Sequence, residues 1–214
     1  MSAPADFVKT HLLAIAGVQR VPAPQLDLFI LRGFLDPALC ETLIDQIEAN
    51  HRPSTIADTN GDATFRTSST CDLDPAAPGL ADLEARFVAA SGIDRKFGEP
   101  VQGQRYAAGQ EFKAHTDYFE PGGADFERYC AVSGQRTWTF MVYLNAVPVG
   151  GATRFKTIDK IIQPEVGKLL AWNNRLPGGA VNPATLHQAL KVRTGRKYVI
   201  TRWYREQHWP SGGT

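Results

Sequence analysis

The feature that most constrains the fold is the division of the chain into a helical first part and a strand-rich second part. Helical periodicity with capping residues predicts helices over 6–17, 36–50 and 79–91. Apolar runs separated by Gly, Pro and Asn predict strands at 26–35, 101–107, 111–117, 137–145, 152–155, 166–172 and 197–205. Because helices precede most strands without βαβ alternation, we expect an α+β fold with largely antiparallel sheets, such as a barrel or jelly roll.

The length and composition indicate one large globular domain. The chain has 214 residues, of which 43% are hydrophobic and 21% charged. Its formal net charge is +1 and it contains no run of like charge, so a nucleic-acid or membrane surface has no electrostatic support. We expect an N-terminal helix and linker over 1–25, the main domain over 26–207 and a short tail over 208–214.

The cysteines and the N-terminus bear on the compartment. Cys40, Cys71 and Cys130 are an odd number at wide spacing, which argues against a disulfide framework and favours a reducing environment. The N-terminus lacks the basic region of a signal peptide, and no apolar run approaches the ~20 residues of a membrane span. The expected location is the cytoplasm.

The segment "EFKAHTDYF" (111–119) places His115 two residues before Asp117. On a strand these two side chains share a face, so they could form a metal site, a catalytic pair or a structural contact. His187, in "NPATLHQAL", is the best further candidate, and two imidazoles with one carboxylate are the ligand set of non-haem Fe(II) sites. A structural zinc site would need four protein ligands, usually including cysteine.

A lysine ten residues after His187 is the next candidate. Lys197 begins an alternating strand in phase with Val199, Thr201 and Trp203, and a lysine that points into a barrel needs an anion. Beside an iron site, a suitable anion is the distal carboxylate of a keto acid. The competing interpretation places Lys197 in solvent beside Arg196.

Taken together, these motifs resemble the catalytic domain of the prolyl 4-hydroxylases, within the Fe(II)- and 2-oxoglutarate-dependent dioxygenases. The resemblance covers roughly 27–206 and includes "RTSSTCDL", "QRYAAGQEFKAHTD", "GQRTWTFMVYLNAVPVGGATRF", "GKLLAWNN" and "LHQALKVRTGRKYVITRWYRE". It implies a double-stranded β-helix, or jelly roll, flanked by N-terminal helices. It also implies an enzyme that uses Fe(II), 2-oxoglutarate and O₂, with L-ascorbate as a candidate reductant.

The resemblance assigns roles to individual residues. His115, Asp117 and His187 would be the iron ligands, and Lys197 would pair with the distal carboxylate of 2-oxoglutarate. Hydroxyl groups of Tyr106 and Thr139 would assist Lys197, whereas Tyr143 on the strand of Thr139 is expected to be core packing. Related halogenating enzymes have a small residue at the carboxylate position, so an intact Asp117 indicates hydroxylation.

The substrate is less constrained than the metal site. Arg66 could hold a carbonyl or carboxylate and Trp203 could face a pyrrolidine ring, although a loop ion pair and core packing are the competing roles. The family makes a prolyl residue in a peptide or protein the first expectation, and a free amino acid or small molecule the alternative. The long irregular segments 50–78, 118–135 and 173–186 are candidate lids or binding segments.

Two readings from other classes remain open at this point. A zinc protein or metallohydrolase would explain the three ligands but leaves Tyr106 and Lys197 without a role. A non-catalytic jelly-roll module that binds a partner would not need an intact ligand set.

Overall fold

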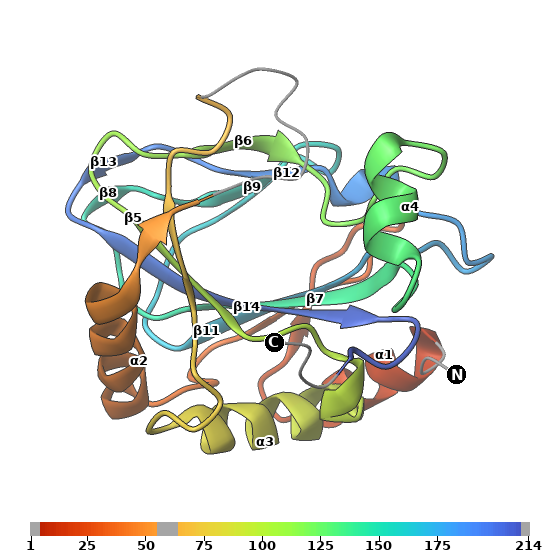
Figure 1. The fold of residues 1–214 in the computed structure, drawn as a ribbon, viewed down its shortest axis with the longest axis horizontal. Coiled ribbons are helices and arrows are strands. Elements are labelled where there is room, and N and C mark those ends of the chain that lie inside the picture. Colours follow the sequence, from red (N-terminus) through yellow and green to blue (C-terminus); the bar gives the residue numbers. More distant parts are fainter. Residues whose placement is uncertain (1–4, 55–63, 211–214) are drawn as a thin grey trace.

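Two antiparallel β-sheets face each other in the computed structural model, which describes residues 5–54 and 64–210 (Figure 1). The large sheet has the strand order β1-β2-β11-β7-β14-β5-β4-β3, and the facing sheet has the order β10-β9-β12-β6. A short third sheet pairs β13 with β8. The architecture is the expected α+β double-stranded β-helix with flanking N-terminal helices.

The helices are α1 (Ala5–Ala14), α2 (Pro37–Asn50), α3 (Leu80–Ser91) and α4 (Ala124–Cys130), with 3-10 turns η1 (Arg95–Phe97) and η2 (Pro183–Thr185). The strands of the large sheet are β1 (Gln19–Arg20), β2 (Leu28–Leu31), β3 (Arg52–Pro53), β4 (Ser69–Asp72), β5 (Gln102–Tyr106), β7 (Arg136–Tyr143), β11 (Lys168–Asn173) and β14 (Lys197–Arg205). The remaining strands are β6 (Phe112–His115), β8 (Val149–Gly150), β9 (Thr153–Phe155), β10 (Lys160–Ile162), β12 (His187–Ala189) and β13 (Val192–Thr194).

The large sheet separates two hydrophobic cores because its side chains alternate between its faces. Trp138, Phe140 and Val142 of β7 point outward, into a core shared with helices α1, α2 and α3. Met141 and Tyr143 point inward, into the core between the two sheets. Figure 1 shows α2 and α3 on the side of the large sheet away from the facing sheet, so the inner face is left for a binding site.

The predicted ends of α2 and α3 agree with the structure, whereas the first helix was predicted over 6–17 and α1 ends already at Ala14. The side chain of Asp36 caps α2 by accepting from the backbone N–H of Leu39 (2.9 Å). Gly92 ends α3 in the left-handed conformation, with φ of 68°. Val8 and Leu12 of α1 are fully buried in the outer core, so the N-terminal helix packs onto the domain. Within the described residues, none of the helices has the length and hydropathy of a membrane-spanning segment.

Three expectations about local structure were wrong. The segment 118–135 is not wholly irregular, since it contains α4, and the segment 50–78 contributes β3 and β4 to the sheet. Residues 55–63 of that segment lie outside the described part of the chain. Strand β6 ends at His115, so Asp117 lies just beyond the strand and not within it.

Candidate metal centre

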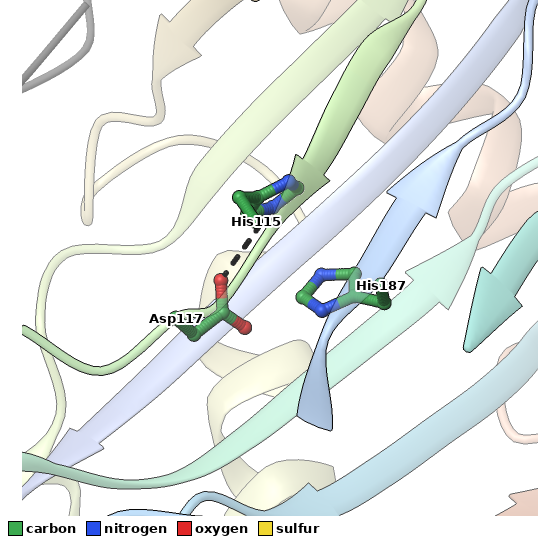
Figure 2. A group of neighbouring side chains, drawn as sticks. All are labelled: His115, Asp117 and His187. Carbon is green, nitrogen blue, oxygen red and sulfur yellow. Dashed lines mark ion pairs between the residues drawn. The ribbon is translucent and has the colours of Figure 1, made fainter. Parts of the chain in front are cut away.

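His115, Asp117 and His187 converge on the inner side of the sandwich (Figure 2). His115 ends β6 and pairs directly with His187, the first residue of the neighbouring strand β12. Asp117 is two residues further along the chain from His115, and one ligand atom from each side chain lies within 4.8 Å of the others. His115 Nε2 and Asp117 Oδ1 are 3.9 Å apart.

The backbone fixes which nitrogen each histidine offers. Nδ1 of His115 lies 2.8 Å from the carbonyl oxygen of Lys113, and Nδ1 of His187 lies 2.8 Å from that of Thr185. A carbonyl only accepts hydrogen bonds, so each Nδ1 carries a proton and donates. In the neutral ring the Nε2 lone pair is then free, which is the tautomer that binds a metal through Nε2.

The protonation states suit a cation at this position. Burial, and secondarily the neighbouring His187, lowers the pKa of His115 to about 3, so its imidazole is neutral at physiological pH. Burial pushes the pKa of Asp117 upward, but the surrounding positive charge, including that of Arg136, and the hydrogen bond from Thr139 hold that pKa below its usual value. The carboxyl is therefore ionised, and the site offers two imidazole nitrogens and one negative oxygen.

Thr139 is bonded to Asp117 in this structure, and its expected contact with the co-substrate stays a prediction. The hydroxyl of Thr139 donates to Asp117 Oδ2 (2.7 Å) and accepts from the side-chain amide of Asn174 (2.9 Å). Thr139 is fully buried and is not among the residues that line the cavity, and its single proton is directed at the carboxylate. The inward register expected for Thr139 is correct, but its hydroxyl is not offered to the cavity.

A buried charge cluster behind Asp117 was not foreseen from the sequence. Arg136 donates to both carboxylate oxygens of Glu99 (2.6 and 2.7 Å) and to the backbone carbonyl of Asp117 (3.3 Å). Its guanidinium also lies 4.1 Å from the ring centroid of Trp203. Arg205 donates to the same Glu99 (3.1 Å), so one carboxylate joins two arginines. The Arg in "GQRTWTF" was visible as part of a motif, whereas nothing in the sequence marked Glu99 as its partner.

Lys197 points into the cavity beside the triad, as the alternating pattern predicted. Its side chain is 1% exposed, whereas Arg196 is exposed to solvent. Its ammonium lies 5.0 Å from the ring centroid of Tyr106 and 5.3 Å from that of Tyr143. In the described part of the chain no carboxylate pairs with it, and burial lowers its pKa to about 7.

The two tyrosines beside Lys197 differ in what they offer. Tyr143 is fully buried and its hydroxyl donates to Thr153 (2.6 Å), which agrees with the packing role expected for it. Tyr106 lines the cavity opposite Lys197 on the paired strand β5, and burial raises the pKa of its phenol. Tyr106 is therefore protonated and able to donate a hydrogen bond.

Trp203 and Arg66 differ in how they meet the cavity. Trp203 lines the cavity, and its indole nitrogen has no hydrogen-bond partner in the part of the chain that the structure describes. Arg66 is set back from the lining and donates to Ser68, Thr70 and Gln102 at 3.1–3.2 Å. Its guanidinium lies 4.8 Å from the ring centroid of Phe112, and the same ring stacks on His115 with centroids 3.5 Å apart. The ion pair that the competing interpretation required for Arg66 is absent among the described residues.

These observations fit Fe(II) and a small dianion. Two imidazole nitrogens and one carboxylate oxygen are the donor set of the 2-His-1-carboxylate triad, which leaves positions open for other ligands. Lys197, Trp172 and Trp203 line the same cavity, and among the described residues neither indole nitrogen has a hydrogen-bond partner. An open cleft of about 690 Å³, larger than the cavity of about 30 Å³ at the triad, is lined by Arg105 and Arg196 but by none of the triad residues.

Comparisons with known proteins agree with the geometry. A sequence profile of the 2OG-Fe(II) oxygenase superfamily matches residues 101–205. Prolyl 4-hydroxylase 13 of Arabidopsis thaliana is 28% identical in a 199-residue alignment that covers 84% of this chain and 71% of that protein. A second Arabidopsis thaliana protein, probable prolyl 4-hydroxylase 9, is 28% identical over 82% of this chain and 67% of its own length.

Solved structures of prolyl hydroxylases have a similar fold. The viral collagen prolyl hydroxylase vCPH from Paramecium Bursaria Chlorella virus-1, in its 2OG complex, aligns with a TM-score of 0.64 and 28% identity, over 83% of this chain and 95% of that one. A prolyl hydroxylase from Trichoplax adhaerens in complex with a hypoxia inducible factor peptide fragment aligns with a TM-score of 0.62, over 94% and 88% of the two chains. At 15% identity, the latter likeness concerns the fold alone.

Proposed function

The chain carries a prolyl 4-hydroxylase-like domain of the 2OG-Fe(II) oxygenase superfamily, and on that premise we propose that it hydroxylates a prolyl residue of a peptide or protein. The co-substrates are 2-oxoglutarate and O₂, and the metal is Fe(II). The observation that carries the proposal is that one cavity joins the His115–Asp117–His187 triad to the unpaired ammonium of Lys197. A triad alone would also serve a metallohydrolase, but a metallohydrolase gives no role to a buried lysine beside it.

We assign His115, Asp117 and His187 as the iron ligands. Each histidine presents Nε2 because its Nδ1 is held by a backbone carbonyl, and Asp117 is held by Thr139. When bound, iron and 2-oxoglutarate supply the oxidative chemistry, in which O₂ converts the keto acid to succinate and CO₂ and one oxygen atom enters a substrate C–H bond. The residues of the chain position the reactants and keep water out.

Lys197 and Tyr106 form the proposed 2-oxoglutarate site. They are directly opposite each other on β14 and β5, so the ammonium and the phenol can meet one carboxylate. The carboxylate would restore the charge of Lys197, because an adjacent anion offsets the burial that lowers its pKa. Tyr106 would add a hydrogen bond from a neutral donor.

Arg66 and Trp203 are the proposed substrate contacts. Trp203 lines the cavity, its N–H has no partner among the described residues, and the guanidinium of Arg136 packs on its ring. Arg66 is held by neutral oxygens, so its charge remains available for a carbonyl or carboxylate of the substrate. The names of the similar proteins, including a collagen prolyl hydroxylase, support a prolyl substrate.

The cysteines bear on the compartment in which the protein works. All three cysteines, Cys40, Cys71 and Cys130, are free and buried, which supports the proposed reducing, cytoplasmic compartment. L-ascorbate is the proposed reductant that keeps the iron in its ferrous state. The proposed bounds of the oxygenase domain are residues 26–207.

Succinate formation tests this function without knowledge of the substrate. Purified protein with Fe(II), 2-oxoglutarate and O₂ should release succinate slowly, and His187→Ala should release none. Proline-containing peptides should accelerate the release, whereas acceleration by free amino acids alone would favour the small-molecule alternative. No succinate with any of these substrates would favour a non-catalytic binding module.

A further inference from the structure

A line of polar side chains connects the proposed co-substrate contact to the proposed substrate contact. Gln102, Gln104 and Tyr106 alternate along β5 and share the inner face of the sheet. The hydroxyl of Tyr106 lies 2.9 Å from Gln104 Oε1, and Gln104 Nε2 lies 3.3 Å from Gln102 Oε1. Arg66 Nη2 then lies 3.2 Å from the same oxygen of Gln102. Gln104 is 6% exposed and lines the cavity between the two ends.

Arg66 determines the direction of every hydrogen bond in this line. A guanidinium only donates, so the atom of Gln102 that faces Arg66 is the carbonyl oxygen. That oxygen also faces Gln104, so Gln104 must turn its NH₂ group toward Gln102. The carbonyl oxygen of Gln104 is then left facing Tyr106, and Tyr106 must donate.

The phenol of Tyr106 has one proton and therefore one hydrogen bond to give. In this structure the proton is given to Gln104 Oε1. A 2-oxoglutarate carboxylate held by Lys197 and Tyr106 needs the same proton. The two acceptors therefore compete, and Gln104 loses its partner when the co-substrate binds.

We propose that Gln104 is a positioning residue that holds the hydroxyl of Tyr106 until 2-oxoglutarate takes it over. The inference rests on the proposed function of Lys197 and Tyr106. Binding of the co-substrate exchanges the Tyr106–Gln104 bond for a Tyr106–carboxylate bond. It leaves Gln104 Oε1 facing the cavity as an acceptor, while Gln104 Nε2 keeps Gln102 and Thr201 as partners.

Calorimetric titration of 2-oxoglutarate into the Mn(II)-loaded protein tests the competition without turnover. Gln104→Met keeps the side-chain length but removes the competing acceptor, so 2-oxoglutarate should bind about three- to tenfold more tightly than to the unaltered protein. Simple damage to the cavity would instead weaken the binding of 2-oxoglutarate. Gln104→Glu provides an acceptor with a negative charge, so binding should weaken by about tenfold or more.

A second variant keeps Gln104 in place. In Gln102→Met nothing holds the NH₂ group of Gln104 toward Gln102, and Thr201 can pair with either end of the amide because a hydroxyl both donates and accepts. Gln104 can then turn its NH₂ group toward Tyr106, so 2-oxoglutarate should again bind more tightly. The double variant should gain no more than the larger single gain, because both changes free the same proton. Gln46→Met, at a partly buried glutamine on α2, is the matched control and should leave the affinity unchanged.

The result that overturns the inference is an unchanged or weakened affinity in both Gln104→Met and Gln102→Met while the unaltered protein binds 2-oxoglutarate. Failure of the unaltered protein to bind 2-oxoglutarate at all would overturn the proposed function itself. The two failures are thus distinguished within one titration series.

Discussion

His115 and His187 lie opposite each other on antiparallel strands, with ring centroids 4.3 Å apart and each Nδ1 bonded to a carbonyl two residues earlier in the chain. The two identical backbone contacts leave both Nε2 atoms as acceptors on the side of Asp117. A pair of buried imidazoles that both lack a proton at Nε2 has no hydrogen bond to make with each other. A cation between them is the arrangement that satisfies both.

The first prediction concerns this metal site. His115→Ala, Asp117→Ala and His187→Ala should each abolish succinate formation and weaken Fe(II) binding, because a triad has no spare protein ligand. The anaerobic Fe(II) and 2-oxoglutarate complex should show a visible charge-transfer band that each variant loses. His208→Ala, at a histidine that packs on Phe97 away from the site, is the control. If a triad variant kept the band, the substituted residue would not be an iron ligand.

The second prediction concerns Thr139. Thr139→Val removes the hydrogen bond to Asp117 Oδ2 while keeping the shape of the side chain, so Fe(II) affinity should fall about 10- to 100-fold. Thr137→Val is the matched control, since Thr137 donates to the backbone of Tyr204 and not to the triad. A raised Michaelis constant for 2-oxoglutarate with unchanged Fe(II) affinity would show instead that Thr139 contacts the co-substrate.

The third prediction concerns Lys197. Loss of one partner of a buried ion pair typically costs ~3–5 kcal/mol, so Lys197→Ala should raise the Michaelis constant for 2-oxoglutarate by about two orders of magnitude or more. Lys197→Arg keeps the charge and should have a milder effect. Tyr106→Phe removes one hydrogen bond and should also cost less than Lys197→Ala.

The neighbouring Arg196 is the control for this strand register. It is exposed, so Arg196→Ala should leave 2-oxoglutarate kinetics unchanged. A raised Michaelis constant for 2-oxoglutarate in Arg196→Ala, with an unchanged one in Lys197→Ala, would contradict the assignment of the co-substrate site.

The fourth prediction follows from the pKa of about 7 that burial gives Lys197. Below that pH the ammonium is already charged, so binding of 2-oxoglutarate takes up no proton. Above it, each binding event must first protonate Lys197, so the affinity should fall about tenfold per pH unit. Calorimetry in buffers of different ionisation enthalpy should detect the proton uptake. Lys197→Arg stays charged, so its affinity for 2-oxoglutarate should not fall with pH in this way. An equal slope of affinity against pH in both proteins would contradict the prediction.

The strand register of the last strand was predictable because the pattern is local. In "KYVITRW" the alternation itself puts Lys197, Val199, Thr201 and Trp203 on one face, and all four line the cavity. The helix ends at Asp36 and Gly92 were predictable for the same reason, since caps depend on neighbouring residues.

Contacts between distant segments were not predictable from one sequence. Thr139 meets Asp117 and Asn174 from other segments of the chain, so its inward direction could be inferred but its acceptor could not. Glu99 likewise pairs with Arg136 and Arg205, which are distant from it in the sequence, so neither contact could be inferred. Helix α4 was missed because it has only seven residues, follows Pro121-Gly122-Gly123 and is too short to show a clear apolar period.

The central claim is that this cavity hydroxylates a prolyl residue, and product analysis tests it most directly. Protein reconstituted with Fe(II), 2-oxoglutarate and O₂ should add one oxygen atom to a proline-containing peptide, with one succinate released for each hydroxylation. Mass spectrometry with fragmentation should place the oxygen on the proline, and His187→Ala should yield unmodified peptide. Succinate release with the oxygen on a different residue or on a free amino acid would contradict the prolyl assignment, and absence of both products would contradict the enzyme.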